Sequence, residues 1–107
     1  MSRPFPQACI PPSCREVLEE MRTFAEVRLI VAFGSRARGD SDRESDLDLA
    51  ISAPGISRNR WVALRELADE ARTLLWVNLA SLDDMPDPLR RSVLATGVTV
   101  YESDKVA

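Results

Sequence analysis

Apolar residues recur along the chain at two spacings, one typical of helices and the other of strands. Apolar positions three or four residues apart predict helices at residues 14–25, 58–73 and 88–96. Continuous or alternating apolar runs predict strands at residues 29–33, 46–52, 75–79 and 98–101. The predicted order is therefore helix, strand, strand, helix, strand, helix, strand. A polar segment separates the first two strands.

Polar and conformationally special residues mark the ends of these helices. Ser13 begins a capping box for the first helix, and Ser57 is placed to cap the second. The third helix is expected to have Asp87 as its cap and Pro88 at its first helical position, and to end before Gly97. Each predicted helix therefore has a residue suited to at least one of its ends.

The second and third strands each carry polar side chains on one face. Side chains of a strand alternate between the two faces of the sheet. Asp46 and Asp48 therefore project to the side opposite the core-facing residues Leu47, Leu49 and Ile51. In the third strand the same rule places three residues on one face, namely Trp76, Asn78 and Ala80.

The chain is long enough for one compact domain and too short for two. It has 107 residues, of which 45% are hydrophobic. Four prolines fall within residues 1–12 and withhold backbone donors, so this segment is expected to be an extended arm. The folded domain is then predicted to cover residues 13–103.

The charge and the absence of histidine exclude several classes of function. The net charge is -3, and the sequence pI is about 4.9, so the chain lacks the basic field of a nucleic-acid-binding protein. Nucleic acid is therefore not expected as a direct ligand. The chain has no histidine, which excludes Ser-His-Asp hydrolysis and His-ligated zinc. Any metal must be held by oxygen ligands.

The two cysteines and the hydropathy bear on location. Cys9 and Cys14 are too few for a disulfide framework, so they are expected to be reduced thiols. No apolar run has the length of a signal peptide or of a membrane span. We therefore expect a cytoplasmic protein that does not enter a membrane.

A candidate phosphate and metal site lies around the polar segment. Gly34 and Ser35 end a buried strand where backbone amides are expected to point outward, which suits an anionic phosphate. Asp46 and Asp48 follow on one strand face, about 7 Å apart along the backbone given the rise per residue of a strand. Mg²⁺ is commonly bound by one or two carboxylates together with substrate phosphates. These residues therefore predict a site for Mg²⁺ and a nucleoside triphosphate.

The same residues form a recognisable motif. The run from Gly34 to Asp40, GSRARGD, followed by Ser45 to Leu49, SDLDL, resembles the signature of the DNA polymerase β-like nucleotidyltransferase superfamily. Within it, the chain is most similar to the minimal nucleotidyltransferases, over nearly all of residues 14–102. The resemblance implies an α/β (α+β) fold with a polymerase β-like nucleotidyltransferase core. Such a core has a small mixed β-sheet with helices packed on one face.

The resemblance also implies roles for individual residues. Gly34 and Ser35 would contact the triphosphate, Arg36 or Arg38 would neutralise phosphate charge, and the two aspartates would be metal ligands. The family expects a third carboxylate on the next strand, where this chain has Asn78. An amide can offer a metal one neutral oxygen but cannot accept a proton as a carboxylate does.

The missing third carboxylate makes the general-base role and the second cation the weak points of the site. Asp83 and Asp84 follow the third strand in a turn-like segment and are not expected to replace it. One or two Mg²⁺ ions and ATP or another nucleoside triphosphate are the implied ligands.

Two functions follow from the resemblance. The first is a Mg-dependent transfer of a nucleotidyl group, AMP from ATP, to a hydroxyl on a partner protein. Many minimal nucleotidyltransferases act as the antitoxin of a small helical HEPN-domain toxin, so a partner of this kind, in a hetero-oligomer or homo-oligomer, is implied. The alternative is an impaired member that neutralises its partner by binding alone, because of Asn78.

Other candidate residues have simpler explanations. Arg36, Arg38 and Arg43 alternate with acidic residues, which is also typical of a solvated loop whose charges balance. Trp61 and Trp76 could stack on a base, but their positions favour packing in the core or against a partner.

Overall fold

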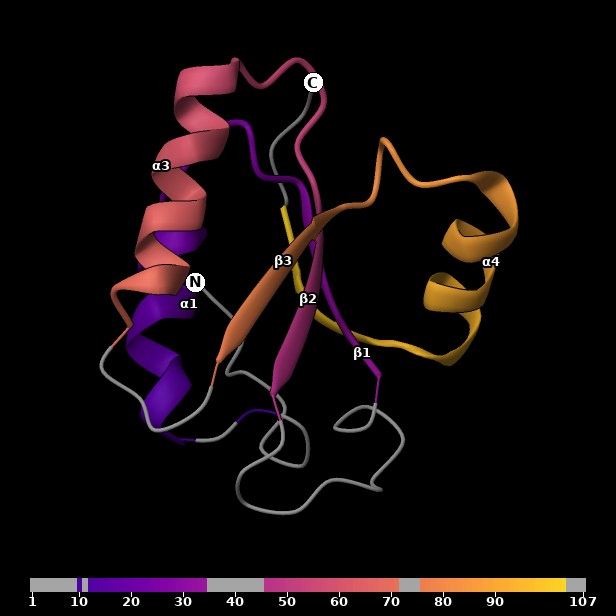
Figure 1. The fold of residues 1–107 in the computed structure, drawn as a ribbon, viewed down its shortest axis with the longest axis horizontal. Helices are drawn as coiled ribbons and strands as arrows, with labels where there is room; N and C mark the ends of the chain where they lie inside the picture. The colour runs from indigo at the N-terminus through magenta and orange to yellow at the C-terminus, as the bar shows by residue number, and fades with distance from the viewer. Residues whose placement is uncertain (1–9, 11, 35–45, 72–75, 104–107) are drawn as a thin grey trace.

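A computed structural model describes residues 10, 12–34, 46–71 and 76–103 of the chain. Within these residues four strands form a single sheet in the order β3-β2-β1-β4 (Figure 1). The strands are β1 (Leu29–Phe33), β2 (Leu47–Ser52), β3 (Val77–Ser81) and β4 (Val98–Glu102). β1 is antiparallel to β2 and to β4, whereas β2 and β3 are parallel. The predicted mixed sheet and the order of the elements are confirmed.

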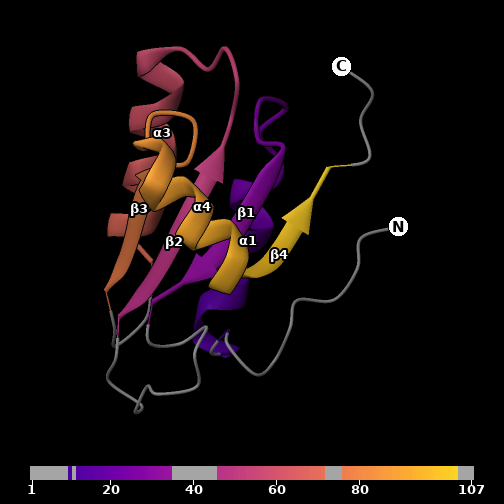
Figure 2. The same ribbon diagram turned by 90° about the vertical axis from the view of Figure 1, so that its right-hand side faces the viewer.

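The helices cover both faces of the sheet. α1 (Arg15–Met21), which follows the short 3-10 helix η1 (Pro12–Cys14), and α3 (Arg58–Asp69) lie on one face, as predicted. α4 (Asp87–Thr96) differs, because it lies on the opposite face (Figures 1 and 2). The reason is that the middle of the sheet is apolar on both sides, where Val31 and Ala50 pair across β1 and β2 and are buried beneath α4. None of the helices in the described part of the chain is long and apolar enough to cross a membrane.

The main core lies between the sheet and the helices α1 and α3. On the sheet it uses the positions of β2 that the pattern assigned to the core, together with alternate positions of β1, and all of them are fully buried: Ile30, Ala32, Leu47, Leu49 and Ile51. The helices contribute Val17, Leu18, Met21, Leu64 and Ala68. Ile10, within the predicted arm, is also buried in this core. Residues 1–9 and 11 of that arm lie outside the described residues.

The second core is smaller and fixes α4 against the other face. Its buried members are Val31, Ala50, Leu82, Met85 and Val93. Gly97 ends α4 as predicted, and its N–H donates to the Val93 carbonyl at 2.8 Å. Its φ of -77° is an ordinary value, so the need for glycine comes from close packing. A Cβ atom at Gly97 would lie 2.5 Å from the Val31 side chain and 2.5 Å from the Val93 carbonyl oxygen.

An ion pair links α3 to the turn that follows α1. Arg60 Nε donates to Glu26 Oε2 at 2.9 Å, and the guanidinium lies 4.2 Å from the centroid of the Phe24 ring. The hydrogen bond to Glu26 raises the pKa of Arg60. The contact fixes the relative position of two elements that share the main core.

Several predicted element ends shift by a few residues. α1 has Cys14 as its N-cap instead of Ser13, because residues 12–14 form η1, and it ends at Met21, where tighter turns carry the chain toward β1. α3 has the predicted cap, since the Ser57 side chain accepts from Arg60 N at 3.2 Å. β3 begins two residues later than predicted, because its pairing with β2 sets its bounds. α4 begins at Asp87 with Pro86 as N-cap.

Candidate active site

The topology brings three chain segments to one end of the sheet. Because β1 and β2 are antiparallel, the end of β1 lies beside the start of β2, and the parallel strand β3 starts at the same end. In register, Asp48 lies between Phe33 on β1 and Asn78 on β3. Gly34, directly after Phe33, therefore meets the acidic start of β2.

The polar side chains at this end interact directly. Asn78 Nδ2 donates to Asp48 Oδ1 at 3.0 Å and to Asp46 Oδ2 at 3.3 Å. The two carboxylates and the amide therefore share one face of the sheet, and the alternation of β2 had predicted a common face for the two aspartates. One amide nitrogen holds the two like charges together, which satisfies an acceptor on each carboxylate.

This face is the one that α4 covers farther along the strands. On the opposite face, the neighbours Leu47 and Leu49 are buried in the main core. Asp46 is exposed and Asp48 is half-buried, so solvent and a ligand can reach both carboxylates. The core on one side holds β2 in place while its acidic side chains remain accessible on the other.

Gly34 is required at this position for two reasons. Its φ of +77° is in the left-handed region, which side chains other than glycine rarely adopt. A Cβ atom at this position would lie 2.6 Å from Asp48 Oδ2, closer than van der Waals contact allows. The sequence pattern assigned Gly34 to phosphate contact, and the structure adds that it leaves room for the Asp48 carboxylate.

The donor set fits a hard cation such as Mg²⁺. Such ions prefer carboxylate and carbonyl oxygens, which Asp46, Asp48 and Asn78 can supply. Asn78 directs its nitrogen toward the carboxylates, and half a turn of the amide would direct Oδ1 there instead. In the part of the chain that the structure describes, no group of three or more His, Cys, Asp or Glu residues could hold a metal. A third carboxylate is thus not placed beside this pair within that part.

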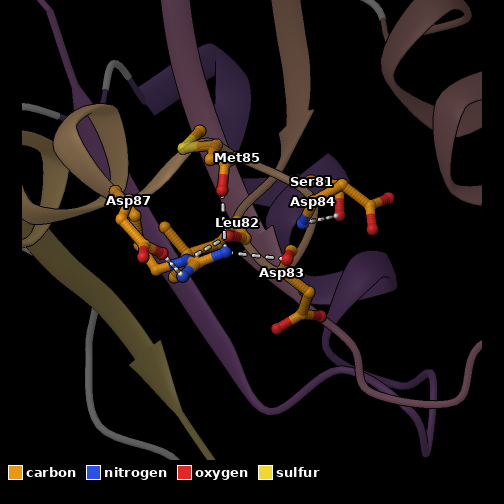
Figure 3. Close-up of polar contacts among 7 residues, drawn as sticks. Ser81, Leu82, Asp83, Asp84, Met85 and Asp87 are labelled. Atoms are coloured by element: carbon orange, nitrogen blue, oxygen red, sulfur yellow. Dashed lines mark hydrogen bonds and ion pairs between the residues drawn. The ribbon is translucent and has the colours of Figure 1, made fainter.

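The sequence predicted that Asp83 and Asp84 do not replace the third carboxylate, and their positions agree with this. The Asp83 side chain accepts from Ser52 Oγ at 2.7 Å and from Ala53 N at 2.9 Å. These partners lie at the far end of β2, roughly 13 Å from Asp48 at the usual rise of a strand. Asp84 belongs to the same turn, where its N–H donates to Ser81 Oγ at 3.3 Å (Figure 3).

Three predicted site residues, Ser35, Arg36 and Arg38, lie outside the described residues. The two tryptophans have different environments. Trp61 packs partly buried against the main core, in agreement with the packing role predicted for it. Trp76 is 72% exposed and so is not a core residue.

Sequence reasoning missed Arg90, which organises the turn between β3 and α4. Its guanidinium donates to three backbone carbonyls, at 2.9 Å from Nε to Leu82, 2.9 Å from Nη2 to Asp83 and 2.7 Å from Nη2 to Met85. Nη1 also donates to the Asp87 carboxylate at 2.7 Å (Figure 3). The Asp87–Arg90 spacing on a helix was a visible signal of this pair. The carbonyl partners left no trace in the sequence.

Comparison with known families decides what kind of site this is. The family model described as polymerase beta, nucleotidyltransferase matches residues 15–106. The chain belongs to this nucleotidyltransferase family. The match includes β1, β2 and β3 and the whole acidic site, so the predicted resemblance is confirmed. A search of curated proteins found no match.

Several solved structures share the fold of this chain. A crystal structure of a toxin–antitoxin with AMP-PNP superimposes with a TM-score of 0.61 at 23% identity, covering 86% of this chain and 73% of the other. The toxin–antitoxin MntA-HepT gives a TM-score of 0.58 at 21% identity, covering 85% and 71%. A mutant form of an MntA toxin–antitoxin gives 0.65 at 23% identity, covering 83% and 72%. At these identities the likeness is one of fold.

Proposed function

We propose that this nucleotidyltransferase transfers AMP from ATP to a hydroxyl group on a partner protein. The observation that carries the proposal is the meeting of Gly34 with the Asp46 and Asp48 carboxylates at one end of the sheet. A phosphate-binding turn beside two accessible carboxylates suits a triphosphate and its cation. AMP-PNP, an adenine nucleotide, is present in one of the structures with this fold, which supports ATP as the nucleotide.

In this reaction the acceptor oxygen forms a bond to the α-phosphorus of ATP. The bond from that phosphorus to the oxygen bridging the α- and β-phosphates breaks, and pyrophosphate leaves with the electron pair. The hydroxyl proton cannot pass to Asn78, because an amide is not a base near neutral pH. The proton would pass to Asp46 or Asp48, the two carboxylates beside Asn78.

The roles of individual residues follow from their positions. Gly34, with Ser35 after it, would hold the phosphates through backbone amides, with Arg36 or Arg38 neutralising their charge. Asp46 and Asp48, with Asn78 after rotation of its amide, would hold Mg²⁺. When bound, Mg²⁺ would offset the negative charge of the reacting phosphates.

The proposed partner is a HEPN-domain toxin for which this chain is the antitoxin. The support is that three structures with this fold are toxin–antitoxin complexes. Transfer of a nucleotidyl group to the toxin would then be the means of neutralising it.

A second function is favoured by one observation. Asn78 is at the position where the resemblance implies a third carboxylate, and its amide donates a hydrogen bond to each aspartate. Under this alternative the chain neutralises the toxin by binding alone, and the site transfers no nucleotide. The two functions differ in whether label moves from ATP to the partner.

The test is transfer of radioactive label to the purified partner. ATP labelled at the α-phosphate should label the partner, whereas ATP labelled at the γ-phosphate should not, because pyrophosphate carries that label away. Asp46→Ala should abolish labelling, and Asp84→Ala, an exposed aspartate far from the site, should leave it unchanged. Labelling that persists in Asp46→Ala would contradict the assigned site. A native chain that neutralises the toxin without labelling it would establish the alternative.

A further inference from the structure

Trp76 is exposed to a degree unusual for its size. It is 72% exposed, more than any other large apolar side chain among the described residues. Indole rings usually bury most of their area in a core or an interface. Neither of the two cores includes Trp76, so the stability of the fold does not account for this residue.

The strand pattern places Trp76 at the candidate active site. Val77 is buried on the face of α1 and α3, and Asn78 is on the opposite face with the two carboxylates. Trp76 shares the face of Asn78, since side chains two residues apart on a strand lie on the same side. Leu47 N donates to the Trp76 carbonyl at 2.9 Å, which continues the β2–β3 pairing to Trp76. The indole is therefore on the acidic face, beside the start of β2.

The order of groups across the sheet indicates which substrate Trp76 would lie beside. Gly34 follows β1, the carboxylates belong to β2, and Asn78 and Trp76 belong to the β3 side, which is an edge of the sheet. In phosphoryl transfer the attacking and leaving oxygens lie roughly in line across the phosphorus. If the leaving pyrophosphate is held at Gly34, the acceptor must approach from the β3 side.

We infer that Trp76 is a contact residue for the acceptor segment of the partner protein. This inference rests on the proposed function and adds the surface by which the acceptor is recognised. An exposed indole offers a flat apolar surface to a protein segment that carries the attacking hydroxyl past Asn78. Stacking of Trp76 on the nucleotide base is the competing use of the same ring. The two uses predict dependence on different substrates.

Fluorescence separates these uses, since the chain has only two tryptophans. The full chain with Trp61→Phe keeps Trp76 as its single indole, and adding Trp76→Phe gives the background from the partner. Titration with the HEPN-domain partner should change the Trp76 emission, whereas Mg-ATP alone should not. A change on adding Mg-ATP alone would overturn the inference in favour of base stacking. Partner binding without any change in emission would also overturn it.

Kinetics give the second measurement. Trp76→Ala should raise the KM for the partner about tenfold, in the range of a buried aromatic contact at an interface, and leave the KM for ATP unchanged. Leu89→Ala on α4, another exposed apolar residue, is the matched control and should change neither KM. An increase confined to the KM for ATP would refute the acceptor contact.

The two measurements keep this inference separate from the proposed function. If the native chain binds the partner but transfers no label, the transferase proposal fails. The emission titration still decides whether Trp76 contacts the partner.

Discussion

Gly34 and Gly55 form a natural pair for testing how the site is built. Their φ angles are nearly equal, at +77° and +76°, so an added side chain meets the same backbone strain at both positions. Their surroundings differ. A Cβ atom at Gly34 would lie 2.6 Å from Asp48 Oδ2, whereas one at Gly55 would have no atom within 4 Å apart from those of Gly55 and its chain neighbours. Alanine at the two positions therefore separates the cost of the backbone conformation from the cost to the carboxylate.

The magnitudes can be worked from these contacts. An L-residue in the left-handed region costs about 1–2 kcal/mol, so both substitutions should lower the free energy of unfolding by this amount. At Gly34 the atom in the way is the end of the Asp48 side chain, which can turn aside. Turning it breaks the hydrogen bond from Asn78, which adds about 1 kcal/mol. Gly34→Ala should therefore lower the free energy of unfolding by about 2–3 kcal/mol, slightly more than Gly55→Ala.

The effect on transfer should be far larger than the difference in stability. A reacting or ligand group displaced by about 1 Å can reduce the rate roughly 100-fold. Urea denaturation gives the stability of both variants, and label transfer below their unfolding transitions gives the rate. Gly34→Ala should lose about two orders of magnitude in rate, whereas Gly55→Ala should transfer normally. Equal rates in the two variants would refute the claim that Gly34 positions Asp48.

Three further substitutions test other contacts. Arg90→Ala should lower the free energy of unfolding by about 2–3 kcal/mol, because three backbone carbonyls lose a charged donor, and exposed Arg91→Ala should cost little; equal losses in denaturant would contradict this. Gly97→Ala should cost about 2 kcal/mol or more, since its Cβ would meet the Val93 carbonyl, and an unchanged melting temperature would rule out the close contact. Asn78→Asp should lower the melting temperature without Mg²⁺, because three carboxylates then lie side by side, and addition of Mg²⁺ should restore it. A loss that Mg²⁺ does not reverse would show that the third carboxylate does not join a cation site.

The fold was largely predictable because its strands have strong patterns. Leu29–Phe33 is a continuous apolar run, and residues 47–52 alternate, so β1 and β2 were found within a residue of their bounds. The position of α4 was not predictable in the same way. Ala50 fits either face of a sheet, and every residue of β1 is apolar, so the pattern did not reveal that the second face also needs cover. Helix ends shifted where local turns compete with the helical pattern, as after Met21.

The candidate site likewise has features that a local pattern predicts and features that depend on the three-dimensional structure. The period of the second strand was enough to place Asp46 and Asp48 on one face, whereas only the resemblance implied that Asn78 lies beside them, as its hydrogen bonds to both aspartates show. The contact between Gly34 and Asp48 depends on the register between two strands separated by the polar segment, which no local pattern encodes. The sequence also does not indicate which backbone carbonyls Arg90 binds, because every residue has one.

Asn78 connects the two proposed functions through charge. Its amide gives each aspartate a hydrogen bond, so the pair is held together by a neutral donor. A carboxylate at this position would instead place three negative charges side by side, an arrangement that a cation must offset. The asparagine therefore removes a need for a cation to offset a third charge. If Mg²⁺ binds, the amide would have to give up both hydrogen bonds before its oxygen could face the ion. A ligand that binds only the folded chain stabilises it by an amount that rises with the logarithm of the ligand concentration divided by its Kd. The change in melting temperature on adding Mg-ATP therefore tests the two functions. An increase would show that Mg-ATP binds despite the hydrogen bonds of Asn78, as transfer requires. No increase would agree with a chain that neutralises its partner by binding alone.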